Sequence, residues 1–174
     1  MSRFIHPGNT GTQIVLSVLL YDTLTQKEIC ITGLHLKSGY ENYETRRNKE
    51  MKTALTIVND WLKSNNKEDV PQIVSGDFNS EYYLSPSSKY DSLVVDTIQN
   101  EFKYNNALED YSNCDKEDKY YPYVTYNYYH PSIFDYIFYK NLLTSSPGIP
   151  RIIGTIPDGK QGSDHLPVFC KIHL

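Results

Sequence analysis

The chain has 174 residues, a length that suits one domain with its own core and is too short for two. Hydrophobic residues at 39% and charged residues at 22% are typical of a globular protein, and no apolar run is long enough to span a membrane. The net charge of −4 argues against a broad basic face for long nucleic acid, although a local basic funnel is compatible with it. The three cysteines lack metal-ligand spacing, which favours reduced thiols and a cytoplasmic location, with a nuclear one also open.

The first half of the chain predicts a hairpin followed by a β-α-β crossover. Residues 1–12 are polar with Pro and Gly, and we expect them to be irregular. Residues 13–21 and 28–34 are apolar and β-branched, and the short turn between them predicts an antiparallel pair. Residues 43–64 follow a helical period, and 70–80 return to a strand. The helical stripe consists of Met51, Ala54, Leu55, Val58, Trp61 and Leu62.

The second half is less regular. Residues 90–102 predict a weaker helix, 133–139 and 166–172 predict strands, and the Pro-containing stretch 142–162 predicts an extended loop. Between them, residues 111–131 form a long connection rich in Tyr, Asn and Asp. Eight of the 16 tyrosines lie between Tyr104 and Tyr129, where they could stack on bases or simply line a half-exposed loop.

The segment VPQIVSGDFNS, residues 70–80, combines a buried strand with polar side chains at its end. Alternate side chains of an extended backbone share a face, so Asp77 and Asn79 should point together while Phe78 turns into the core. A carboxylate can take a proton from water, and an amide can donate a hydrogen bond to a developing oxyanion. An ordinary Asx turn would use the same residues.

Further polar residues occur where the other apolar segments begin or end, and burying them costs free energy unless they meet partners. Carboxylates, namely Asp164 and possibly Asp77, suit an oxygen-preferring cation such as Mg²⁺ or Mn²⁺. Imidazoles and an amide suit phosphoryl oxygens. Because no Ser or Cys has an adjacent base, attack by an activated water is the simplest chemistry. The set comprises His35, Asp77, Asn79, Asp135, Asp164 and His165.

Four motifs in this order resemble the endonuclease/exonuclease/phosphatase superfamily. They are HLKSG from His35, GDFNS from Gly76, FDYIFY from Phe134 and SDHLPV from Ser163. The form of the histidine motif, the arginine-bearing helix and SDHLPV are most similar to the deadenylase, nocturnin and Angel branch. The resemblance implies a four-layer α/β sandwich, two packed sheets with helices outside, of which residues 1–174 would form a single, partial domain.

The resemblance also implies roles for individual residues. Asp77 would orient or deprotonate the attacking water, and Asn79 would hydrogen-bond the scissile phosphate. His165, oriented by Asp135, would bind and polarise the phosphate, and His35 would contact it from the other side. Metal binding would involve Asp164 together with Asp77, and a phosphate of the substrate would be bound by Lys37.

The resemblance covers nearly all of this chain but only the C-terminal part of the family domain. The Asn and Glu motifs that open the family, the Glu being its main metal ligand, have no match here, so we expect a fragment or a divergent member. Half of such a sandwich would expose an apolar sheet face, which we expect a second copy or a partner chain to cover. The loss of a metal ligand also predicts weak or absent activity for these residues alone.

The function expected is metal-dependent phosphodiester hydrolysis, most simply as a 3′–5′ exoribonuclease acting on RNA or a related nucleotide. One alternative is a binding or scaffold module of the same fold with impaired catalysis. A second is a phosphatase or phosphodiesterase for a small nucleotide, lipid or inositol phosphate.

Overall fold

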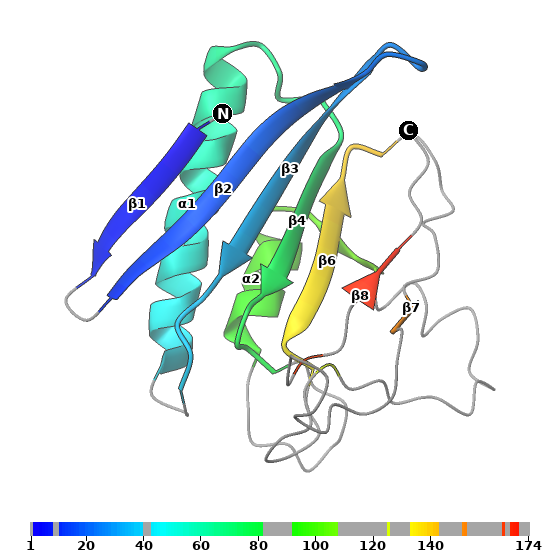
Figure 1. The fold of residues 1–174 in the computed structure, drawn as a ribbon. Helices are drawn as coiled ribbons and strands as arrows, with labels where there is room; N and C mark the ends of the chain where they lie inside the picture. Colours follow the sequence, from blue (N-terminus) through cyan, green and yellow to red (C-terminus); the bar gives the residue numbers. More distant parts are fainter. Residues whose placement is uncertain are drawn as a thin grey trace.

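The computed structural model describes residues 2–8, 11–39, 43–81, 92–107, 125, 133–142, 151–152, 165 and 168–170. In this part of the chain, strands and helices form a mixed α/β arrangement (Figure 1). In chain order the elements are β1 (Ser2–Gly8), β2 (Gly11–Asp22), β3 (Lys27–His35), α1 (Glu44–Ser64), β4 (Gln72–Asp77), α2 (Leu93–Asn100), β5 (Asn105–Asn106), β6 (Asp135–Lys140), β7 (Arg151–Ile152) and β8 (Val168–Phe169).

The main sheet has the strand order β1-β2-β3-β4-β6-β5, and β7 pairs with β8 in a second, two-stranded sheet. β2 and β3 form the predicted antiparallel hairpin. β3 and β4 are parallel neighbours joined through α1, so the predicted β-α-β crossover is confirmed. β4 and β6 run antiparallel, which brings the start of β6 beside the end of β4.

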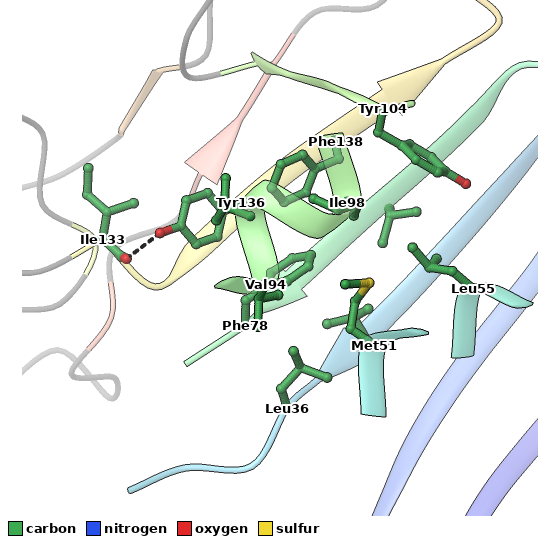
Figure 2. Close-up of a cluster of buried hydrophobic side chains, with 13 residues drawn as sticks. Leu36, Met51, Leu55, Phe78, Val94, Ile98, Tyr104, Ile133, Tyr136 and Phe138 are labelled. Atoms are coloured by element: carbon green, nitrogen blue, oxygen red, sulfur yellow. Dashed lines mark hydrogen bonds between the residues drawn. The ribbon is translucent and has the colours of Figure 1, made fainter. Parts of the chain in front are cut away.

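Both helices cover the same face of the main sheet (Figure 1). The predicted stripe of α1 faces the sheet, because Met51, Leu55 and Leu62 are fully buried. Figure 2 shows this core, where Phe78 packs edge-on against Tyr136 and Phe138, with centroid separations of 5.4 Å and 5.2 Å. The buried members of the main cluster are Leu34, Leu36, Met51, Leu55, Val74, Phe78, Val94, Val95, Ile98, Tyr104, Ile133, Tyr136 and Phe138.

The opposite face of the sheet, which we call the outer face, is buried at β6 and exposed to solvent at β2. At the β6 side Tyr139 is buried, with 6% of its surface exposed. On β2, Ile14, Leu16 and Leu20 are 45%, 40% and 47% exposed. These residues alternate with inward-facing ones along the strand, so they lie on one face. An apolar strip is therefore open to solvent on β2.

Two predictions about irregular segments need correction. Residues 1–12 were expected to be irregular, but β1 pairs with β2 from Ser2 opposite Ser17 to Gly8 opposite Gly11. Pro7 fits because β1 is an edge strand, where a missing N–H donor costs little. Within the expected loop 142–162, residues 151–152 form β7, and β5 was not anticipated. Most of the tyrosine-rich connection 111–131 lies outside the described residues.

Two other properties follow from the described part of the chain. Neither α1 nor α2 combines the length and the apolar composition that crossing a membrane requires. Cys30 and Cys170 are free thiols, and burial raises the pKa of both.

Candidate functional site

Three of the expected site residues lie in one row across the outer face of the sheet. His35 at the end of β3 is the register partner of Asp77 at the end of β4. Asp77 is in turn the partner of Asp135 at the start of β6. Because β3 and β4 are parallel and β6 runs the other way, the C-terminal ends of β3 and β4 lie beside the N-terminal end of β6. His165, three positions before β8, joins this row from a distant part of the sequence.

The side chains of these four residues form a connected set around Asp77. Its Oδ2 lies 3.5 Å from Nε2 of His35 and 3.9 Å from Nε2 of His165. On the other side of the His165 ring, Nδ1 lies 2.7 Å from Oδ2 of Asp135. The side chain of His35 is 67% exposed, whereas that of Asp77 is 18% exposed. The arrangement is thus partly buried at the carboxylates and open to solvent at His35.

The sequence Gly76-Asp77-Phe78-Asn79 builds this corner for local reasons. Gly76 has a φ of 141°, and a Cβ there would stand 1.9 Å from the carbonyl oxygen of Leu34, so another residue would force β3 and β4 apart. Asn79 has a φ of 49°, which Asn tolerates better than most residues. Its N–H donates to Oδ1 of Asp77 at 2.7 Å, which closes an Asx turn. Phe78 is fully buried, as predicted.

The surroundings of Asp77 disfavour the ionised form of its carboxyl group. Burial raises its pKa, and the nearby charge of Asp135 raises it further. The hydrogen bond from the N–H of Asn79 and the two imidazoles act in the opposite direction but do not cancel the burial. A carboxylate with a raised pKa is a stronger base once ionised, and it gains from any cation placed beside it.

Two residues expected to bind substrate, Asn79 and Lys37, make contacts within the chain. One Nδ2 hydrogen of Asn79 is donated to the carbonyl oxygen of Leu36, at 3.0 Å, so part of its donor capacity holds the backbone together. The ammonium of Lys37 lies 5.4 Å from the ring centroid of Tyr43, in cation–π geometry. Tyr104, one of the clustered tyrosines, is a core residue whose hydroxyl donates to Gln72.

One group of potential metal ligands exists among the described residues. Ligand atoms of Asp77, Asp135 and His165 all lie within 4.8 Å of one another. Two carboxylates and an imidazole are donors that divalent cations accept, and a cation would relieve the unfavourable burial of Asp77. The residues present therefore fit a divalent metal. Asp164, the other expected metal ligand, lies outside the described residues.

Sequence reasoning did not find Thr125, which supports the site from within the tyrosine-rich connection. Its Oγ1 accepts hydrogen bonds from the N–H groups of Phe134 and Asp135, at 2.9 Å and 3.2 Å. Thr125 is almost fully buried, so it fixes the start of β6 and with it the position of Asp135. A lone Thr between Val124 and Tyr126 gives no sequence signal for such a role.

Comparisons with known proteins support the fold. No protein-family model matches the sequence, and no curated protein does. Among solved structures, the human Nocturnin catalytic domain matches with 21% identity and a TM-score of 0.60, over 92% of this chain and 52% of that one. An endonuclease/exonuclease/phosphatase family protein from Leptotrichia buccalis matches with 17% identity and a TM-score of 0.64, over 99% and 61%. A mannosyl-6-phosphatase from Bacteroides thetaiotaomicron matches with 18% identity and a TM-score of 0.55, over 90% and 55%.

The chain therefore has the fold of endonuclease/exonuclease/phosphatase proteins, as its motifs indicated. It spans 52% to 61% of the length of the three structures just named. The identities are too low to carry a substrate from any of these proteins to this one.

Proposed function

We propose that the set around Asp77 hydrolyses a phosphoester bond with water, supported by a divalent cation. The observation that carries this proposal is the convergence of His35, Asp77, Asp135 and His165 at one edge of the sheet. Two carboxylates with two imidazoles supply a base, an orienting group and donors for a phosphate, which is the combination that such hydrolysis needs. Proteins of the same fold include a phosphatase, which agrees with this class of reaction.

Each residue has a role that follows from its surroundings. Asp77 takes a proton from the attacking water, whose oxygen bonds to phosphorus while the ester P–O bond breaks and the leaving oxygen takes up a proton from solvent. Asp135 accepts a hydrogen bond from Nδ1–H of His165, which leaves Nε2 to face the phosphate. The exposed ring of His35 approaches the phosphate from the opposite side of Asp77. Mg²⁺ or Mn²⁺, held by Asp77 together with Asp164, would supply stabilisation of the charge that develops on the phosphoryl oxygens.

For the substrate, we propose RNA or a related nucleotide, cleaved from the 3′ end. The motifs from His35, Gly76 and Ser163 are most similar to the deadenylase branch, and Nocturnin is among the proteins of matching fold. Lys37, whose ammonium lies over the ring of Tyr43, would bind a phosphate of this substrate. A cytoplasmic location belongs to the same proposal, in agreement with the free thiols of Cys30 and Cys170.

Two other functions are supported by specific observations. Hydrolysis of a small sugar, lipid or inositol phosphate is supported by the fold shared with the mannosyl-6-phosphatase and by the openness of the site at His35. A binding module with impaired catalysis is supported by the small number of acidic ligands, since among the described residues Asp77 and Asp135 are the acidic members of the potential metal group.

The experiment is an assay of the purified chain with 5′-labelled oligo(A), a dinucleotide, mannose 6-phosphate and inositol phosphates, with Mg²⁺, Mn²⁺ or EDTA. We expect slow, metal-dependent shortening of oligo(A) from its 3′ end, lost in Asp77→Asn. Asp60→Asn is the matched control, because Asp60 is exposed on α1. Exclusive turnover of a sugar or inositol phosphate would replace the RNA proposal. Absence of metal-dependent turnover of every substrate would favour the binding module.

A further inference from the structure

The first turns of α1 contain a buried arginine, and each of its three guanidinium nitrogens contacts an oxygen. Arg47 is 5% exposed, which is uncommon for an arginine unless its charge is paired. Its Nε donates to the carbonyl oxygen of Lys37 at 2.8 Å, and Nη2 donates to that of Gly39. Its Nη1 lies 3.2 Å from Oε2 of Glu44. Arg47 therefore grips the loop that follows His35, through main-chain atoms.

Glu50, one turn further along α1, binds the same loop through the other backbone polar group of Lys37. Its Oε2 accepts the N–H of Lys37 at 3.1 Å, while Oε1 accepts from Nε of Arg46 at 2.9 Å. Both the N–H and the C=O of Lys37 are thus bonded to side chains of α1. Side chains seldom hold both polar groups of a loop residue unless its position matters, since most loops are solvated by water.

Glu44 extends this arrangement to the loop after β4. Its Oε1 accepts from Oγ of Ser80 at 2.6 Å and from the N–H of Val94, in the first turn of α2, at 3.1 Å. Through the Glu44–Arg47 pair, the segment that follows His35 is connected to the segment that follows Asp77. We call Glu44, Arg47 and Glu50 the α1 clamp.

The two loops held by the clamp also bond directly to each other. The N–H of Leu36 donates to the carbonyl oxygen of Asp77 at 2.9 Å, and Nδ2 of Asn79 donates to the carbonyl oxygen of Leu36 at 3.0 Å. Asp77 is itself the acceptor of the first bond, and His35 immediately precedes Leu36, which takes part in both. Their separation of 3.5 Å is consequently set by backbone that the clamp fixes.

We propose that Arg47 and Glu50 are positioning residues, which hold His35 against Asp77 by fixing the loop between β3 and α1. A guanidinium is required at position 47, because its planar fork reaches two carbonyl oxygens and a carboxylate at once, whereas an ammonium cannot match that geometry. The expected effect on the rate rests on the proposed phosphoester hydrolysis, whereas the expected effect on the position of His35 does not. Misplacing a reacting group by about 1 Å can cost on the order of 10²-fold in rate.

The test compares Arg47→Lys and Glu50→Gln with Lys52→Gln. Lys52 is the control because it lies on the same helix and pairs with Glu101, 2.7 Å away, outside the clamp. Two readouts need no catalysis, namely hydrogen exchange of the Lys37 amide and the ring resonances of His35 by NMR. A third is kcat and KM for the best phosphoester substrate, and thermal unfolding reports the cost in stability of each variant.

In Arg47→Lys and Glu50→Gln we expect at least tenfold faster exchange of the Lys37 amide and displaced His35 resonances. We also expect kcat to fall by about 10²-fold with a smaller change in KM. Lys52→Gln should change none of these. If the wild-type chain hydrolyses nothing while the NMR changes appear, the proposed function fails and the clamp stands. Wild-type exchange and wild-type His35 resonances in a folded Arg47→Lys variant would overturn the proposal.

Discussion

Nδ1 of His165 lies 2.7 Å from Oδ2 of Asp135, which joins two residues that are 30 positions apart in the sequence. Asp135 is itself held in place at the start of β6, because its N–H donates to the buried hydroxyl of Thr125. The pairing leaves the other ring nitrogen, Nε2, on the side of Asp77. A carboxylate in this position selects the tautomer of the imidazole and favours its cationic form.

The first prediction concerns this pair. Asp135→Asn should keep the fold, because Asn has nearly the same shape, but it no longer favours a proton on Nδ1. We expect hydrolysis to fall by about 10²- to 10⁴-fold, the usual contribution of an oriented acid or base. Ring ¹⁵N shifts of His165 should show the altered tautomer in the same sample. An unchanged tautomer together with unchanged turnover would contradict this role for Asp135.

The second prediction concerns the pH dependence of stability, measured in EDTA. The folded chain raises the pKa of Asp77 above its ordinary value of 3.8, so the folded state binds this proton more tightly than the unfolded state. Well below pH 3.8 the carboxyl is neutral in both states and costs nothing. As the pH rises through the raised pKa, the buried charge destabilises the folded chain. Asp77→Asn should therefore gain stability relative to wild type with increasing pH.

Denaturant unfolding at several pH values measures this difference, with Asp22→Asn as a control of opposite sign. Hydrogen bonds from Thr25 and from the N–H of Leu24 lower the pKa of Asp22, whose contribution to stability is present above the ordinary value and lost as the pH falls. Asp22→Asn should thus become relatively less stable with increasing pH. Equal slopes for the two variants would show that the environment of Asp77 is not as described.

Much of the fold could be predicted because local patterns and tertiary packing agree. The period of α1 is matched by the burial of Met51 and Leu55, and the apolar stretch of β3 is matched by its central place in the sheet. β1 was missed because its sequence contains Pro7 and Gly8, and its strand conformation depends on pairing with β2. β7 and β5 are two residues long, too short for any period to appear.

The third prediction concerns the hydroxyl of Tyr136, which lies under the site. It is 2.7 Å from the carbonyl oxygen of Ile133 and 2.8 Å from that of Ser80 (Figure 2 shows the first contact). Tyr136→Phe leaves buried acceptors without this donor, and we expect a loss of about 1–3 kcal/mol in the free energy of unfolding. Tyr21→Phe, at a side chain exposed by 58%, should be neutral. Equal unfolding midpoints for the two variants would contradict the prediction.

The residue types of the candidate site could be predicted from the sequence, but the residues that hold them in place could not. His35, Asp77 and Asp135 lie at strand boundaries. They come together because the register of β3 with β4 places His35 opposite Asp77, and that of β4 with β6 places Asp77 opposite Asp135. The α1 clamp and Thr125 act through single contacts with the main chain of distant segments. Such contacts leave no periodic trace in the sequence, so they appear only when the chain is folded.

The last prediction concerns the apolar strip on the outer face of β2, formed by Ile14, Leu16 and Leu20. We expect the purified chain to self-associate through this strip, because contiguous apolar surface of this kind is costly to leave in water. Leu20→Asp removes about 1 kcal/mol of apolar burial for each copy, and a symmetric dimer loses it twice, so association should weaken at least about tenfold. Light scattering over a concentration series measures this. Leu24→Asp, at a turn residue exposed by 92%, should associate like wild type, and a monomer at every concentration would refute the prediction.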